Sequence, residues 1–144
     1  MTLPKSINFK VERYIGGLSQ FKKIKNPIKL SANESALGPS PKAIKAIEKA
    51  KKKIYKYPES DSNSLRQVLS KKFTIDENRI VCGSGSDQIF DLTCRVFLEP
   101  GDEVITSEFG FIMYRIYASI YKAKIILAKE KNFKASPDEI LKKV

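Results

Sequence analysis

From Arg79 onward the sequence alternates short apolar segments with longer segments of helical period, and this alternation most narrows the folds open to the chain. Strands are expected at Arg79–Cys82, Glu103–Ser107 and Ile125–Ala128, and helices over Ile89–Phe97 and Phe111–Tyr121. Strands that alternate with helices through short connections are typical of α/β proteins with a parallel sheet. The sequence therefore predicts an α/β fold with a β-α-β-α-β segment.

The first half of the chain lacks this alternation. Residues 1–30 have no clean hydrophobic period and predict an irregular N-terminal arm, which a turn-rich loop follows. Ser40 and Pro41 are a helix N-cap and first-turn pair, and Ser64 with Gln67 is a capping-box candidate. Two helices are therefore expected before the α/β segment. The apolar face of the first helix consists of Ala43, Ile47, Ala50 and Ile54. The apolar face of the second helix is expected to be buried and consists of Leu65, Val68, Leu69 and Phe73.

The residue types that the chain lacks exclude several kinds of chemistry. Because there is no histidine, a Ser-His-Asp or Cys-His nucleophile, a histidine-ligated metal and a histidine general base are excluded. The two cysteines, Cys82 and Cys94, make neither a zinc site nor a disulfide scaffold, and no metal site is expected. The remaining possibilities are carboxylates, lysine, tyrosine, backbone amides or an organic cofactor.

The formal net charge of +11 raises the question of a polyanionic partner. Of the 27 basic residues 22 are lysine, with one dense run from Lys49 to Lys56. Base readout and bidentate phosphate contacts favour arginine, and the sequence contains no nucleic-acid-binding motif. The lysine run is open to two interpretations, a solvated helix face or a polyanion contact. We therefore expect no nucleic-acid partner, and a basic nucleic-acid-binding protein is kept as the alternative hypothesis.

The sequence shows no targeting segment. The first thirty residues lack a continuous apolar stretch, and the longest uninterrupted apolar stretches in the chain are only a few residues. No membrane partner is therefore expected, and the predicted location is the cytoplasm. Two unpaired cysteines fit a reducing compartment.

A glycine-rich loop, Gly83-Ser84-Gly85-Ser86-Asp87, joins the first predicted strand to the next helix. The N–H groups and the positive dipole end at a helix N-terminus stabilise an anion. Ser86 could cap the helix and also give its hydroxyl to a phosphate. The sequence matches neither the dinucleotide fingerprint nor the P-loop. The loop is therefore open to two interpretations, a phosphate site or a tight turn with a capping serine.

A run of aromatic residues follows the second predicted strand. Phe109-Gly110-Phe111-Ile112-Met113-Tyr114 lies where parallel-sheet proteins bind their ligands, at the carboxyl end of a strand. One of these rings could stack on a flat cofactor ring. The alternative is that they belong to the core.

Five segments, in their order and spacing, carry a family resemblance that extends from about Tyr14 to the C-terminus. They are Lys29–Ala43, Tyr57-Pro58, Ile80–Asp87, Leu98–Val104 and Phe111–Tyr114. The chain resembles the N-terminal part of histidinol-phosphate aminotransferases, which are pyridoxal-phosphate enzymes of the aspartate-aminotransferase fold. Ser35-Ala36 stands where this family usually has Asn-Pro, and Gln88 where it usually has Glu.

The resemblance implies a partial large domain of the aspartate-aminotransferase type, PLP fold type I. In that arrangement residues 1–30 are an N-terminal arm. Residues 31–78 are a loop and helical segment that links to the small domain and the dimer interface. Residues 79–144 begin the pyridoxal 5'-phosphate (PLP) binding large domain.

The resemblance also implies site residues. Ser86 and Asp87 match positions that hold the cofactor phosphate, and Phe111 matches the aromatic residue that stacks on the pyridine ring. Tyr57 matches a tyrosine that reaches the phosphate of the neighbouring subunit's cofactor, which implies a homodimer.

The substrate side of the site is implied by the arm and the turn-rich loop. Tyr14 and Asn33 fall in segments that cover the substrate. The family reaction moves an amino group between histidinol phosphate and 2-oxoglutarate in histidine biosynthesis. A related aminotransferase with another amino donor is the alternative within the family.

The chain is shorter than the members of this family, whose Schiff-base lysine lies beyond the residue that corresponds to Val144. No catalytic residue is therefore assigned here, and Ser70-Lys71, the single Ser-Lys pair, lies before the phosphate loop. A truncated chain is expected to be inactive alone, with unpaired strand edges that make it marginally stable or aggregation-prone. A non-catalytic fragment that binds PLP or phosphate is the other alternative.

Overall fold

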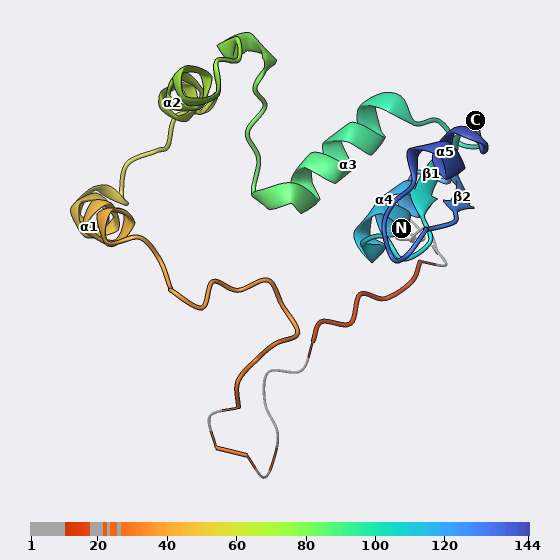
Figure 1. The fold of residues 1–144 in the computed structure, drawn as a ribbon. Helices are drawn as coiled ribbons and strands as arrows, with labels where there is room; N and C mark the ends of the chain where they lie inside the picture. Colours follow the sequence, from red (N-terminus) through yellow and green to blue (C-terminus); the bar gives the residue numbers. More distant parts are fainter. Residues whose placement is uncertain (1–10, 18–21, 23, 26) are drawn as a thin grey trace, which may run out of the picture. The chain divides into compact units, whose positions relative to one another are not determined.

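The computed structural model describes residues 11–17, 22, 24, 25 and 27–144, and within it the chain divides into two compact units. One unit contains Ile15–Cys82, and the other contains Gly83–Val144 with the described residues up to Tyr14. Helices α1 and α2 belong to the first unit, and α3, β1, α4, β2 and α5 to the second (Figure 1).

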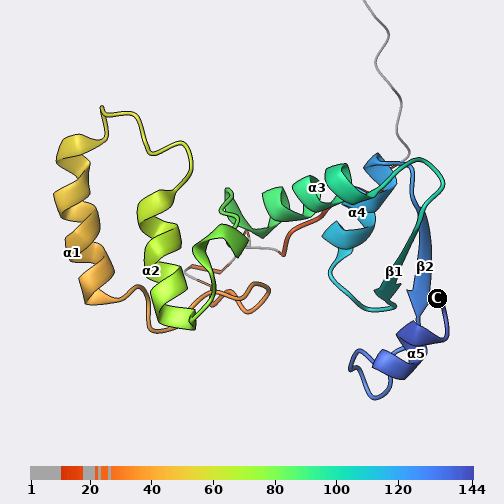
Figure 2. The same cartoon turned by 90° about the horizontal axis from the view of Figure 1, so that it is seen from above.

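The second unit is built on a two-stranded parallel sheet. Strand β1 (Glu103–Ser107) pairs residue for residue with β2 (Lys124–Ala128), and helix α4 (Ile112–Ile120) connects them. The two strands run side by side in the same direction (Figure 2). Parallel strands need a crossover of this kind because a hairpin turn would reverse the chain. The predicted parallel strand–helix–strand arrangement of an α/β fold is confirmed here.

Helices cover this sheet and supply its small core. Helix α3 (Gly85–Phe97) packs against α4, which contacts both strands (Figure 2). Helix α5 (Pro137–Leu141) contacts β1 and begins after Ser136, at a Ser-Pro pair like the one that begins α1. The core therefore lies around α4 and its contacts with the strands. The buried apolar residues of the described chain are Ile116, Ala118, Ala123 and Ala128.

The strand expected at Arg79–Cys82 is not formed, so this prediction is wrong. A short 3-10 helix, η2 (Glu77–Arg79), occupies its start, and the backbone of Ile80 is extended (φ −110°, ψ 122°). Val81 is 73% exposed. An extended segment becomes a strand only when its N–H and C=O groups pair with a neighbour, and the sheet of the described residues contains β1 and β2 alone.

The first unit is helical. Helix α1 (Pro41–Ala50) continues into the 3-10 turn η1 (Lys51–Lys53), and α2 (Asn63–Phe73) follows, so both predicted helices are confirmed. The Arg66 guanidinium donates hydrogen bonds of 3.0 and 2.7 Å to the Glu77 carbonyl and so ties α2 to η2.

Two details of this helical unit differ from expectation. Ser64 is not an N-cap, because Ser62 holds that position and the Ser64 N–H and hydroxyl donate to the Glu59 carboxylate at 2.9 and 2.7 Å. The apolar face expected to be buried on α2 is largely exposed, with Val68 at 63% and Phe73 at 57%. No further layer of this unit covers that face in the described part of the chain.

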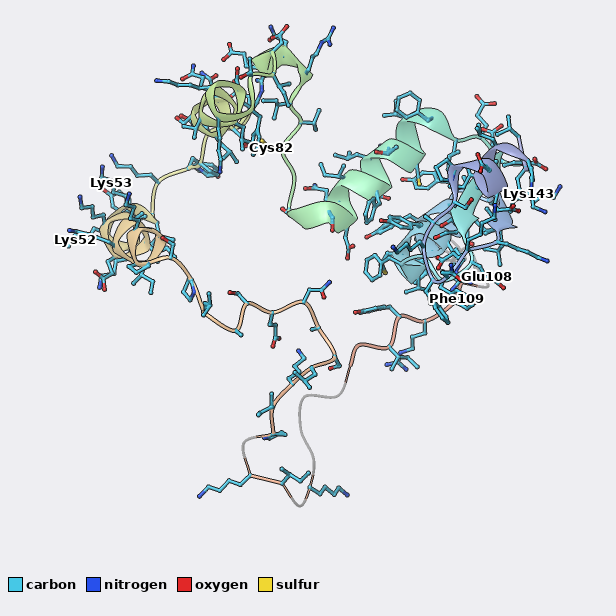
Figure 3. The ribbon with its side chains drawn as sticks, viewed as in Figure 1. Lys52, Lys53, Cys82, Glu108, Phe109 and Lys143 are labelled. Atoms are coloured by element: carbon cyan, nitrogen blue, oxygen red, sulfur yellow. The ribbon has the colours of Figure 1, made fainter. Side chains whose placement is uncertain are left out.

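The lysine run lies at the end of α1. The side chains of Lys52 and Lys53 project outward from it (Figure 3), and both residues are exposed. Both interpretations of the run, solvated face and polyanion contact, need this exposure.

The N-terminal arm predicted for residues 1–30 is described in part. Residues 1–10, 18–21, 23 and 26 lie outside the described residues, and residues 11–17 form neither helix nor strand. Across the described ranges, every helix is too short or too polar to cross a membrane.

Candidate functional site

The glycine-rich loop forms a sharp entry into α3. Gly85 begins the helix with φ +80°, in the left-handed region that favours glycine. A Cβ on Gly83 would lie 3.0 Å from Gln88 Oε1 and from Ile89 Cδ1, so a larger residue there would require these two side chains to shift. The backbone therefore requires glycine at position 85, and side-chain packing favours it at position 83.

Ser84, rather than Ser86, holds the N-cap position of α3, so the predicted capping role of Ser86 is wrong. The Ser84 side chain makes no capping hydrogen bond, and the Ser84 N–H instead donates to Gln88 Oε1 at 2.5 Å. Ser86 and Asp87 lie in the first helical turn and are exposed. The first-turn N–H groups of a helix lack intrahelical partners and carry the positive end of the dipole. This turn therefore has the donors that an anion needs.

Phe111 lies at the N-cap position of α4 and is 45% exposed. Its ring meets the ring of Tyr14 edge to face, with centroids 6.1 Å apart and an interplanar angle of 81°. It meets Tyr114 in the same way at 6.1 Å and 89°. Edge contacts of this kind leave part of the Phe111 ring open to a further flat partner.

A chain of aromatic contacts links the start of α3 with the start of α4. Phe90 follows Ser86 by four residues and so lies on the same helix face. The Phe90 ring packs against Tyr114 at 4.9 Å, and Tyr114 in turn contacts Phe111. The candidate phosphate turn and the candidate stacking ring therefore belong to one packed unit.

Three titratable side chains near these aromatic residues have a raised pKa, which favours their neutral form. Burial, with the nearby carboxylates of Asp87 and Asp91, raises the pKa of Tyr117. Burial and the hydrogen bond from the Tyr121 hydroxyl to Asp91 (3.0 Å) raise the pKa of Tyr121. Burial, with Asp91, also raises the pKa of the Cys94 thiol, so this cysteine is a poor nucleophile.

An apolar cavity of about 380 Å³ lies beyond the aromatic contacts, between α3, α4, α5 and β1. Phe90 and Tyr114 form part of its wall, together with Cys94 and Ile140. The aromatic residues of the segment after β1, Phe109–Tyr114, differ in whether they contact this cavity. Tyr114 packs against the cavity, whereas Phe109 is 66% exposed and lies beside Glu108 in the loop after β1 (Figure 3).

The other predicted site residues lie in the helical unit. Tyr57 is fully exposed between η1 and α2, and Asn33 is exposed in the loop before α1. The structure thus brings Tyr14 to Phe111 and places Ser86 beside Asp87, while the roles of Tyr57 and Asn33 stay predictions. Sequence reasoning missed Phe90, although its four-residue spacing from Ser86 was a usable signal.

The sequence matches a family model, aminotransferase class I and II, over residues 25–144. A histidinol-phosphate aminotransferase of Pelagibacter ubique (strain HTCC1062) is 53% identical over 144 residues, which is 100% of this chain and 40% of that relative. One of Rhodopseudomonas palustris (strain BisA53) is 46% identical over 116 residues, 81% of this chain and 32% of that relative.

Solved structures share the fold. A histidinol-phosphate aminotransferase of Sinorhizobium meliloti, in complex with pyridoxal-5'-phosphate, superposes with a TM-score of 0.75 at 24% identity over 78% of this chain and 30% of its own. An aspartate aminotransferase of Thermotoga maritima gives 0.65 at 21% identity, over 81% of this chain and 34% of its own. The predicted aspartate-aminotransferase-like fold is confirmed by these two structures.

The chain spans about two-fifths of the length of the curated relatives that it matches. The family model covers most of the chain, and the Pelagibacter relative matches it along its whole length. The resemblance found in the sequence is thereby confirmed: the chain belongs to the class I and II aminotransferase family.

Proposed function

We propose that this chain is the cofactor-phosphate-binding part of a histidinol-phosphate aminotransferase. The reaction is the transfer of the amino group of histidinol phosphate to 2-oxoglutarate, which yields imidazole acetol phosphate and glutamate in histidine biosynthesis. The observation that carries the proposal is the 53% identity to the Pelagibacter relative over the full 144 residues. Further relatives of the same name are 37–46% identical.

The residues at the starts of α3 and α4 fit the cofactor PLP. The exposed first turn of α3 has N–H donors at Ser86 and Asp87. Gly85, with φ +80°, sets the direction in which the chain enters this turn. A dianionic phosphate is the group that such a turn favours. The half-open ring of Phe111 suits the flat pyridine ring. When bound, PLP supplies an electron sink for negative charge on the substrate carbon next to the amino group.

In this proposal the chain's own residues bind, orient and exclude water. Ser86 and Asp87 hold the phosphate through backbone N–H groups, and the Ser86 hydroxyl adds a donor. The Asp87 carboxylate lies in the same turn and opposes an anion, so the N–H groups carry the binding. Phe111 covers one face of the cofactor ring. Tyr14 and Asn33 cover the substrate.

The proposed enzyme is a homodimer in the cytoplasm, with Tyr57 reaching the cofactor phosphate of the neighbouring subunit. No lysine of this chain is assigned to hold the cofactor covalently or to move the substrate proton. Lys71, of the single Ser-Lys pair, lies on the last turn of α2, in the helical unit. We therefore expect the 144-residue chain alone to be inactive.

A comparison of amino donors tests the proposed function. Glutamate formation from 2-oxoglutarate is measured, with PLP present, for the polypeptide of the relatives' length and for the 144-residue chain. Histidinol phosphate is the expected donor for the longer polypeptide, and histidinol, which lacks the phosphate, is the matched control. Faster reaction with an aromatic amino acid or a threonine-phosphate derivative would replace the proposed substrate. No glutamate with any donor, but retained PLP binding, would favour a non-catalytic fragment.

A further inference from the structure

Two contacts hold the described part of the arm against α4. The Arg115 guanidinium lies 3.7 Å from the Glu12 carboxylate, and the Tyr14 ring meets the Phe111 ring at 6.1 Å. All four residues belong to the same compact unit. They join the arm to the helix end that carries the exposed face of Phe111.

The spacing of these contacts fixes how the arm runs. Glu12 and Tyr14 are two residues apart, which is about 6.6 Å in an extended chain. Phe111 and Arg115 are four residues apart, which is about 6 Å along a helix and one turn on the same face. The two contacts therefore match in spacing, and the arm runs antiparallel to α4.

The two partners of the ion pair differ in how exposed their side chains are. The Arg115 side chain is 29% exposed and the Glu12 side chain 61%. Both also line a groove of about 310 Å³ whose other residues come from α4 and β2. The anchor of the contact is thus the arginine on the packed helix, and the arm is the part that can leave.

We propose that Arg115 is a positioning residue, which through Glu12 holds Tyr14 against the aromatic ring of Phe111. An arm held in this way keeps the half-exposed Tyr14 ring against the Phe111 ring. An arm released from Arg115 loses this contact and leaves more of the Phe111 ring exposed to water. Arg115 then sets how often the substrate side of the site is covered, and it touches neither substrate nor cofactor.

Trypsin cleavage after Arg13 tests the contact without any activity measurement. Arg13 lies between the two contact residues, so the rate of cleavage there follows the fraction of molecules with a released arm. Because a partly exposed ion pair contributes little, Arg115→Gln is expected to raise this rate roughly two- to fivefold. Arg115→Lys, which keeps the positive charge opposite Glu12, should retain slow cleavage. Lys124→Gln is the matched control, because it removes the exposed 2.6 Å pair with Glu103.

Equal cleavage after Arg13 in wild type, Arg115→Gln and Lys124→Gln would overturn the proposal, as would cleavage of Arg115→Lys that is as fast as that of Arg115→Gln. A second measurement rests on the proposed function. With histidinol phosphate as donor, Arg115→Gln should raise KM about two- to fivefold and leave kcat unchanged. A lower kcat at unchanged KM would instead indicate a purely structural role. If no donor reacts, the proposed function fails and the cleavage result stands by itself.

Discussion

Replacement of Gly85 by alanine separates the geometry of the phosphate turn from the stability of the fold. Gly85 has φ +80°, and a Cβ added there would meet no heavy atom within 4 Å. The effect of Gly85→Ala therefore comes from backbone strain alone. Gly101, in the turn before β1, also has positive φ (+102°) and open space around its Cβ position, so Gly101→Ala is the matched control.

The expected magnitudes follow from the backbone. A non-glycine residue in the left-handed region costs about 1–2 kcal/mol, and the loss of glycine's freedom in the unfolded chain returns about half of that. Both variants should therefore lower the free energy of unfolding by roughly 1 kcal/mol. Relief of the strain at Gly85 is expected to reorient the Ser86 N–H, so that its proposed hydrogen bond to the cofactor phosphate is lost. A hydrogen bond to a charged group contributes about 1.5–3 kcal/mol, so PLP should bind roughly ten- to a hundredfold more weakly.

Equilibrium binding of PLP and of pyridoxal, which lacks the phosphate, provides the assay. Gly85→Ala should weaken the binding of PLP and leave that of pyridoxal unchanged, and Gly101→Ala should change neither. Urea unfolding checks that the two variants are equally stable. Equal PLP affinity in the two variants, or an equal loss for pyridoxal, would refute a phosphate site at the start of α3.

Two further predictions concern the packing behind the site. Because burial and the bond to Asp91 raise the pKa of Tyr121, the folded chain favours the protonated phenol, and this stability is complete below about pH 10 and lost as the pH rises further. Unfolding in urea at pH 8 to 11 should therefore show a steeper alkaline loss for wild type than for Tyr121→Phe, and parallel curves would contradict this. Phe90 is half-buried against Tyr114, so Phe90→Ala should cost about 2 kcal/mol in urea unfolding. Phe97→Ala, at a side chain that is 75% exposed on the same helix, should cost far less, and equal losses would contradict the packing role of Phe90.

The elements that were predictable from the sequence are those decided by local signals. Strand β1 follows a Pro-Gly-Asp turn, and α1 and α5 each begin with a Ser-Pro pair, so their starts follow from turn and cap chemistry. The segment Arg79–Cys82 would form a strand only if it paired with a neighbouring strand, and the sheet of the described residues contains β1 and β2 alone. Its apolar residues predict a strand from the local pattern, which carries no information about that pairing. Long-range pairing is the information that a local pattern lacks.

The candidate site likewise has one part that local sequence signals predict and another part that they do not. Gly85 and the turn that it begins were visible as a glycine-rich loop before a helix, because the loop and the helix adjoin in sequence. The contact of Tyr14 with Phe111 joins residues almost a hundred positions apart, and no periodicity in the sequence announces it. The roles proposed for Tyr57 and Asn33 involve a second subunit and the substrate, and the residues next to them in sequence specify neither.

A crystal structure of the protein with PLP would test the central claim most directly, namely that the starts of α3 and α4 form a cofactor site. The expected result is a phosphate within hydrogen-bond distance of the Ser86 and Asp87 N–H groups and a pyridine ring against Phe111. A phosphate bound elsewhere, for example among the exposed lysines Lys49–Lys56, with the first turn of α3 open to water, would contradict it.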